Sequence, residues 1–309
     1  MADYSIKTIF MGTPAITLPA FEALVRDDRF DVMAVYTQPD RPIGRSSQPM
    51  PPAVKIRAQK HDIPVYQPEQ ITETTVEQIK SFNPDLIVVF AFRHILPKNI
   101  LEIPKYGCVN IHPSLLPRWR GASPVAYAIL NGDEKTGVSY MLMDEKLDHG
   151  PIIKQIEHEI PAGVTTDKLT EDLAILAAQN LVPSLVDYVE EKITPEPQDE
   201  SKVTLSKELK RNDAKIDWNK SAKEIEQQIR AFTLWPGSYC SWDDKKIKII
   251  KAELGPDEPK LEPGQTQNEL VGTCNGNLKL IEVQLEGKKP MSIQQFINGY
   301  QDFSQTQLS

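Results

Sequence analysis

Three polar side chains in this sequence could act together on a carbonyl group. Asn110 and His112 lie two residues apart in a short apolar run, so on a strand both side chains point to the same face. Asp148 lies further along the chain in a polar turn. An amide can donate to a developing oxyanion, an imidazole can carry protons, and a carboxylate can orient and charge the imidazole. The set suits acyl transfer.

Each of these residues also has a purely structural interpretation, which the spacing leaves open. An Asn-x-His pair in a strand is more often structural than catalytic, and an aspartate near a glycine is usually a turn residue. Other chemistries have less support. The sequence contains no G-x-S-x-G pattern, and Gly12-Thr13-Pro14 lacks the spacing of a nucleotide-binding loop. No cluster of ligand residues points to a metal, so none is expected.

The segments that must position these residues alternate between apolar strands and amphipathic helices. This alternation predicts parallel β-α-β units in an α/β, doubly wound, mostly parallel sheet. Ligands bind such sheets beyond the carboxyl ends of the strands. The strands are expected over residues 5–11, 30–37, 63–66, 85–91 and 109–112, and the helices over residues 18–25, 53–60 and 74–82.

The remainder of the chain predicts an extension of the sheet and a second domain. Two runs on either side of Asp148, at 137–143 and 151–156, could add an antiparallel pair, and a helix from about 166 to 191 follows. Several short strands with turn signals then predict a small C-terminal β-barrel, like an OB-fold. We expect a catalytic domain over 1–192, a polar linker over 193–209 and the barrel over 210–309.

Composition and charge are those of a two-domain globular protein. The 309 residues are 40% hydrophobic and carry a formal net charge of −8. Residues 1–200 contribute −9 and residues 201–309 contribute +1, so charge alone does not identify a partner. Three cysteines without CxxC spacing suggest neither disulfides nor zinc. No signal peptide or membrane span stands out. We expect a cytoplasmic monomer.

One long segment and one shorter one carry a family resemblance. Residues 110–124, N-I-H-P-S-L-L-P-R-W-R-G-A-S-P, followed by L-D-H-G-P at 147–151, resemble the signature of 10-formyltetrahydrofolate-dependent formyltransferases. The segments at 10–14, 37–45, 229–239, 282–291 and 296–299 resemble the branch that acts on methionyl-tRNA. The resemblance covers nearly the whole chain, in order.

This resemblance implies an activity and its residues. It implies formyl transfer from 10-formyltetrahydrofolate to methionyl-initiator tRNA, with Asn110, His112 and Asp148 as the catalytic residues. The residues expected to form the folate pocket are Ser114, Leu115, Leu116 and Pro117, together with Phe92, Ile95 and Leu96 from a second loop. The cations expected to hold the tRNA are Arg41, Arg45, Lys207, Lys210, Arg211, Lys288 and Lys289, with Lys245, Lys246 and Lys248 as further candidates.

The chain departs from the family pattern at three places. Arg93 stands where glycine is common, and its side chain could either reshape the folate pocket or face solvent. Residues 46–48 are Ser-Ser-Gln where lysines are usual, which removes phosphate contacts from this loop. His149 stands where a small residue is usual, and we interpret it as incidental to catalysis.

Two other functions compete with this interpretation. The same catalytic domain could formylate a small amine such as glycinamide ribonucleotide or an amino sugar. A protein that only binds folate or RNA is the second alternative, against which the complete set of Asn110, His112 and Asp148 argues.

Overall fold

The computed structural model describes residues 5–42 and 48–309. The chain divides into two compact units, and each is built from more than one stretch of sequence. The expected domain boundaries at residues 192 and 209 stay a prediction. Short segments of the N-terminal part of the sequence belong to the C-terminal unit. The first unit comprises residues up to 121 with 136–158 and 170–205, and the second comprises 122–135, 159–169 and 206–309.

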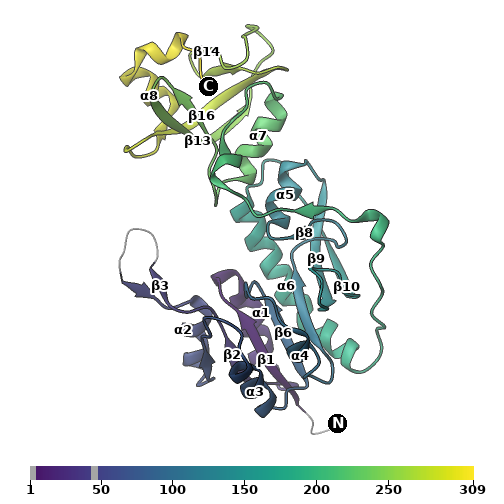
Figure 1. Cartoon of the computed structure of the whole chain (residues 1–309). Coiled ribbons are helices and arrows are strands. Elements are labelled where there is room, and N and C mark those ends of the chain that lie inside the picture. Colours follow the sequence, from purple (N-terminus) through teal and green to yellow (C-terminus); the bar gives the residue numbers. More distant parts are fainter. Residues whose placement is uncertain (1–4, 43–47) are drawn as a thin grey trace. The chain divides into compact units, whose positions relative to one another are not determined.

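A seven-stranded sheet forms the centre of the first unit, with the strand order β10-β9-β7-β6-β1-β2-β5 (Figure 1). The five strands from β7 to β5 run parallel, and β9 is antiparallel to β7. This arrangement confirms the predicted fold class. The strands are β1 (Ile6–Gly12), β2 (Phe30–Tyr36), β5 (Val65–Tyr66), β6 (Leu86–Phe90), β7 (Cys108–His112), β9 (Lys135–Leu142) and β10 (Ile152–Glu159).

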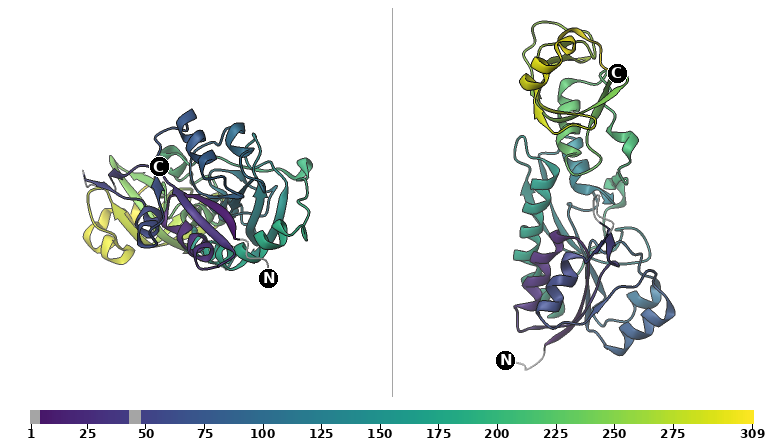
Figure 2. Two further views of the ribbon diagram at one scale, coloured as in Figure 1. Left: turned by 90° about the horizontal axis from the view of Figure 1, so that it is seen from below. Right: turned by 90° about the vertical axis from the view of Figure 1, so that its left-hand side faces the viewer.

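Helices cover both faces of this sheet, because alternate residues of each buried strand need an apolar partner. On one face, Val76 and Ile79 pack against the odd-numbered side chains of β1, such as Ile9. On the other face, the Phe10 ring lies 5.4 Å from the Phe21 ring. The right-hand view of Figure 2 shows helices on both sides of the strands. The helices are α1 (Leu18–Val25), α2 (Ala53–Lys60), α3 (Glu73–Ser81), α4 (Lys98–Leu101) and α6 (Thr166–Val189), with the short η1 (Ala15–Thr17).

An ion-pair cluster joins the first two α-helices of the unit. Glu22 on α1 accepts hydrogen bonds from Arg57 at 2.8 Å and from His61 at 3.0 Å. Burial raises the pKa of Glu22, but the hydrogen bonds from His61 and Arg57 outweigh it and leave the pKa below its usual value. The carboxylate form of Glu22 is therefore favoured in the folded chain.

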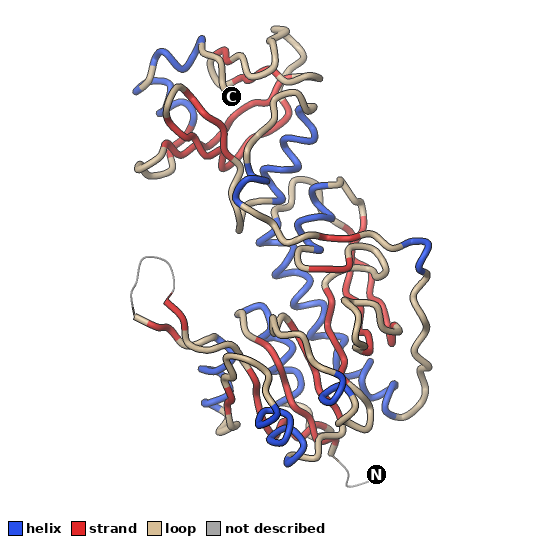
Figure 3. The backbone as a smooth tube through the Cα atoms, in the orientation of Figure 1, coloured by secondary structure: helices blue, strands red, loops and turns tan. Residues whose placement is uncertain are grey.

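The second unit has a curled antiparallel sheet, whose strands are red in Figure 3. The strand order is β12-β13-β16-β15-β14, and β17 also pairs with β16. This agrees with the expected OB-like barrel. Its strands are β12 (Tyr239–Trp242), β13 (Lys245–Leu254), β14 (Thr266–Gln267), β15 (Leu270–Gly272), β16 (Asn277–Leu285) and β17 (Met291–Ser292). Its helices are α5 (Pro124–Leu130), α7 (Ala222–Ala231), α8 (Ile293–Gly299), η3 (Arg211–Ala214) and η4 (Gln301–Gln305).

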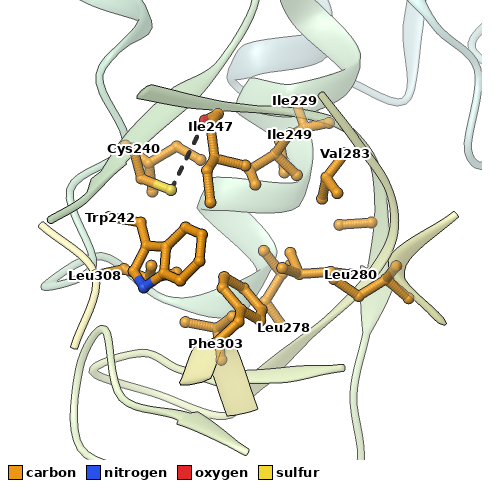
Figure 4. Close-up of a cluster of buried hydrophobic side chains, with 14 of the residues drawn as sticks. Ile229, Cys240, Trp242, Ile247, Ile249, Leu278, Leu280, Val283, Phe303 and Leu308 are labelled. Atoms are coloured by element: carbon orange, nitrogen blue, oxygen red, sulfur yellow. Dashed lines mark hydrogen bonds between the residues drawn. The ribbon is translucent and has the colours of Figure 1, made fainter. Parts of the chain in front are cut away.

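Buried side chains from β12, β13, β15 and β16, together with others from α7, α8 and η4, form one core (Figure 4). Trp242 lies edge-on to Phe296 and to Phe303, each with a centroid separation of 5.7 Å. Such aromatic contacts add about 1 kcal/mol each to the free energy gained by burial. Helix α7 begins at a capping box, in which Ser221 and Glu224 satisfy each other's backbone N–H groups. Both features stabilise the second unit.

Five short elements of the described chain remain. Strand β3 (Arg41–Pro42) pairs antiparallel with β4 (Pro49–Met50), and β8 (Arg120–Gly121) follows the predicted folate segment. The other two, η2 (Glu200–Lys202) and β11 (Leu205–Ser206), lie in the predicted linker. No helix in the described part of the chain is long and apolar enough to cross a membrane.

Candidate active site

The strand β7 and the turn between β9 and β10 bring the predicted catalytic residues together. Asn110 is the third residue of β7 and His112 is the last, so both lie toward the carboxyl end of a parallel strand. Asp148 lies in the turn with a left-handed backbone, at φ 46°. Because β9 is antiparallel to β7, the last residue of β9, Leu142, pairs with Val109 near the start of β7. Asp148 in the turn that follows β9 then contacts Asn110.

The Asp148 carboxylate is the centre of this group. One oxygen accepts from the Asn110 amide at 3.4 Å, and the other accepts from the backbone N–H of Gly121 at 2.8 Å. The second oxygen also lies 3.8 Å from Nδ1 of His112. The His112 and Asp148 side chains are 5% and 12% exposed, so solvent screens their interaction weakly. The three side chains form one cluster.

The other ring nitrogen of His112 is held by the backbone. Nε2 lies 3.0 Å from the carbonyl oxygen of Trp119. A carbonyl can only accept, so Nε2 carries a proton and Nδ1 is the nitrogen that faces Asp148. The N–H of Trp119 in turn donates to the Thr204 hydroxyl at 2.9 Å. The imidazole ring is thus fixed in orientation by a segment on which sequence reasoning placed no such role.

The predicted folate segment, Ser114 to Pro117, is anchored on the neighbouring strands. Ser114 is fully buried and donates its hydroxyl to the Arg118 carbonyl at 2.6 Å. The N–H of Leu116 donates to the Ser139 hydroxyl at 3.1 Å, and the Leu116 carbonyl accepts from the Gln155 amide at 2.8 Å. Leu115 and Pro117 are partly exposed. A segment held in this way can present a fixed surface to a ligand.

The second predicted wall of the folate pocket divides into buried and exposed parts. Phe92 and Leu96 are buried in the core under the loop, whereas Ile95 is 89% exposed. Arg93 is exposed, so its side chain faces solvent, and its backbone is left-handed at φ 69°. This conformation explains why glycine suits the position. Nε2 of His94 is buried and has no hydrogen-bond partner in the described part of the chain.

The cations predicted to hold tRNA are exposed or partly exposed wherever the structure describes them. Arg41 lies on β3 and pairs with Glu69 at 2.7 Å, while Arg45 lies outside the described residues. Arg211 lies over the Trp235 ring at 5.6 Å. In the second unit, the exposed members are Lys207, Lys210, Arg211, Lys245, Lys246, Lys288 and Lys289, while Lys248 is partly exposed. All of these side chains are accessible to phosphates.

Two further observations concern the surroundings of the site. His149, next to Asp148 in sequence, pairs through Nδ1 with Asp144 and not with Asp148. Within residues 5–42 and 48–309, no group of three or more His, Cys, Asp or Glu residues is placed to hold a metal ion.

Comparison with known proteins identifies the family. The Formyl transferase family model matches residues 6–185, and the model for the Formyl transferase C-terminal domain matches residues 208–301. A methionyl-tRNA formyltransferase of Bacillus cytotoxicus is 43% identical over 301 residues, covering 95% of this chain and 96% of that protein. The chain belongs to the methionyl-tRNA formyltransferase family.

A second relative supports this assignment, and a structural neighbour shares the fold. The methionyl-tRNA formyltransferase of Citrifermentans bemidjiense is 41% identical, covering 96% of this chain and 94% of that protein. An N-formyltransferase from Helicobacter canadensis, solved with folinic acid and dTDP-3-aminofucose, has a TM-score of 0.69 and 21% identity. The match covers 89% of this chain and 98% of the neighbour, and the two proteins share the fold. The family resemblance predicted from sequence is confirmed.

The sequence did not reveal which groups hold the candidate catalytic residues of this formyltransferase in place. The Gly121 N–H and the Trp119 carbonyl act through the backbone, so no side chain pattern marks them. Gln198 donates to the carbonyls of Asp148 and Gly150 from a segment predicted to be a linker. The nearest signal was indirect: Trp119 and Gly121 lie within the matched segment at residues 110–124.

Proposed function

We propose that this chain transfers the formyl group of 10-formyltetrahydrofolate to the α-amino group of methionyl-initiator tRNA, as a cytoplasmic monomer. The main support for this reaction and this acceptor is the similarity to methionyl-tRNA formyltransferases, at 41–43% identity over nearly the full length of the chain. The cluster of Asn110, His112 and Asp148 supplies the groups that formyl transfer needs.

The reaction exchanges one bond to the formyl carbon for another. The acceptor's amino nitrogen bonds to the formyl carbon, the bond from that carbon to N10 of the folate breaks, and one proton passes from the amine to N10. The carbonyl oxygen bears negative charge in between, so a donor aimed at it lowers the barrier. We assign this role to the Asn110 amide, which would donate a hydrogen bond to the carbonyl oxygen. In the structure the amide nitrogen of Asn110 points toward the Asp148 carboxylate.

His112 and Asp148 manage the proton in this proposal. Because Nε2 of His112 donates to the Trp119 carbonyl, Nδ1 is the nitrogen free to exchange a proton or to donate to the oxyanion. Asp148 faces that nitrogen and can accept or relay the proton lost by the amine. The Gly121 N–H occupies one carboxylate oxygen and thereby fixes the direction in which Asp148 points.

The formyl donor is proposed to lie against Leu115 and Pro117 and beside the loop that carries Ile95. Leu115 and Pro117 are partly exposed on an anchored segment, and Ile95 is an exposed apolar side chain. Phe92 and Leu96 would support this loop from beneath, because both are buried in the core. Apolar surface on a rigid support is what a flat ring system requires.

Substitution of the catalytic candidates tests their roles. We expect Asn110→Ala and His112→Ala to lose at least about 100-fold in kcat while staying folded, as removal of an oxyanion donor does elsewhere. The matched control is Asn180→Ala, which removes an asparagine amide that donates to the Leu176 carbonyl within α6. Near-normal turnover in either active-site variant would contradict the assigned roles.

The acceptor is tested by comparing charged and uncharged substrates. The assay measures formyl transfer to methionyl-initiator tRNA, with uncharged tRNA, free methionine and a nucleotide-linked amino sugar as controls. Product only with the charged tRNA supports the proposal. Product with the amino sugar would instead support the small-amine alternative, and folate binding without any product would support a binding protein.

Phosphate contacts from the second unit predict a steep salt dependence of tRNA binding. Removing one cation that neutralises a phosphate reduces the magnitude of the negative slope of log K against log salt by about 0.7 to 0.9. We expect the double variant Lys288→Gln/Lys289→Gln to reduce this magnitude by about 1.5. The charge-matched control is Lys223→Gln/Lys260→Gln, which removes two exposed lysines of the same unit. Equal slopes in the two double variants would count against a specific role for Lys288 and Lys289.

A further inference from the structure

A side chain from the predicted linker is tied directly to the turn that carries Asp148. The amide nitrogen of Gln198 donates to the carbonyl oxygens of Asp148 and Gly150, each at 2.8 Å. These carbonyls lie 50 and 48 positions away in sequence from Gln198. Both hydrogens of one amide nitrogen are therefore used on one short turn.

The amide of Gln198 is itself held in this orientation. Its oxygen accepts from Nε of Arg120 at 3.0 Å, so the nitrogen must face the turn. Arg120 is 5% exposed, and its guanidinium group also donates to Glu200 at 2.7 Å. The chain residue after Arg120 is Gly121, whose N–H donates to the Asp148 carboxylate. One segment thus fixes both Gln198 and the carboxylate.

The turn needs this restraint because its backbone is unusual. Asp148 adopts φ 46°, which a non-glycine residue adopts at a cost. Gly150 packs so closely that a Cβ there would lie 1.9 Å from the Leu142 carbonyl oxygen. With both carbonyls of the turn pinned by Gln198, the Asp148 carboxylate is directed at Asn110 and His112.

We infer that Gln198 is a positioning residue for formyl transfer, which acts by holding the Asp148 turn and does not touch either substrate. The inference rests on the proposed catalytic role of Asp148. A displacement of about 1 Å at a reacting group can cost on the order of 100-fold in rate. The linker segment around residue 198 then contributes to catalysis by holding the Asp148 turn in place.

The test compares Gln198→Ala and Gln198→Glu with the unaltered full-length chain. Gln198→Ala removes both donors, and Gln198→Glu keeps the size of the side chain but offers the two carbonyls an acceptor in place of the donors. We expect kcat to fall about tenfold or more in both, with KM for the folate donor and for methionyl-tRNA within about twofold. A residue that only fills space would lose activity in the alanine variant alone.

A matched control separates positioning from general loss of hydrogen bonds. The Asn277 amide also donates to two carbonyls, those of Pro256 and Pro259, at 2.9 and 2.7 Å, but in the second unit. Asn277→Ala should retain kcat. Unchanged kcat in Gln198→Glu, or an equal loss in Asn277→Ala, would overturn the inference. If the alanine variant fails to fold, the glutamate variant decides. Absence of transfer by the unaltered chain would instead refute the proposed function.

Discussion

Replacement of Arg93 by glycine should stabilise the first unit, since the position is a left-handed one. Arg93 has φ 69° and an exposed side chain. This conformation costs a non-glycine residue about 1 to 2 kcal/mol. Glycine also has more conformational entropy in the unfolded chain, and this offsets about 0.5 to 1 kcal/mol of the strain energy that the substitution relieves. The net expectation is a free energy of unfolding that rises by about 0.5 to 1 kcal/mol.

Scanning calorimetry is the suitable assay for this change, because the two units need not unfold in one transition. For a unit of this size, the expected gain raises Tm by about 1 to 4 °C. The control is Arg93→Ala, which removes the same side chain but keeps a Cβ in the left-handed conformation. We expect no increase in Tm for the alanine variant. If the glycine variant melts no higher than the alanine variant, backbone strain at Arg93 is refuted.

Three further changes test other parts of the molecule. Gly150→Ala should abolish formyl transfer and lower Tm, because its Cβ would lie 1.9 Å from the Leu142 carbonyl oxygen; a normal Tm would contradict the close packing. In the native chain only Cys274 should react with a thiol reagent, since burial raises the pKa of the other two thiols to about 12, and counting modified sites by mass spectrometry checks this. The carboxylate of Glu22, with its lowered pKa, should stabilise the fold above its usual titration range, and this contribution should disappear as pH falls through the folded-state pKa. Urea unfolding of Glu22→Gln should therefore differ from that of the unaltered chain at neutral pH and converge with it in acid.

The sequence predicts the elements of the sheet well because their signals are local. Strand β6 is a continuous apolar run, and two-residue periodicity places Asn110 and His112 on one face of β7. The elements missed in the second unit are short. Strand β14 has two residues and helix α8 has seven, which are one repeat of the strand pattern and about two turns of helix, too few for periodicity to identify either element.

The candidate site could be predicted only in part, for a physical reason. The side chains that carry chemistry have characteristic types, so Asn110, His112 and Asp148 could be proposed from sequence. Their supports are not marked in this way, because the Gly121 N–H and the Gln198 amide interact with residues 27 and 50 positions away. Any polar stretch contains such groups. Only the folded chain tells which of them meets the turn.

The interleaving of the two units has a consequence for synthesis of the chain. Helix α5 packs against α7, yet α7 follows it in the chain only after roughly ninety residues. At the rate of translation this gap corresponds to roughly 5 to 20 s on the ribosome. During that interval the buried face of α5, including Val125 and Ile129, has emerged without its partner. The last third of the chain thus shields an apolar surface made earlier, and release before residue 231 would leave that surface open to aggregation and chaperone binding.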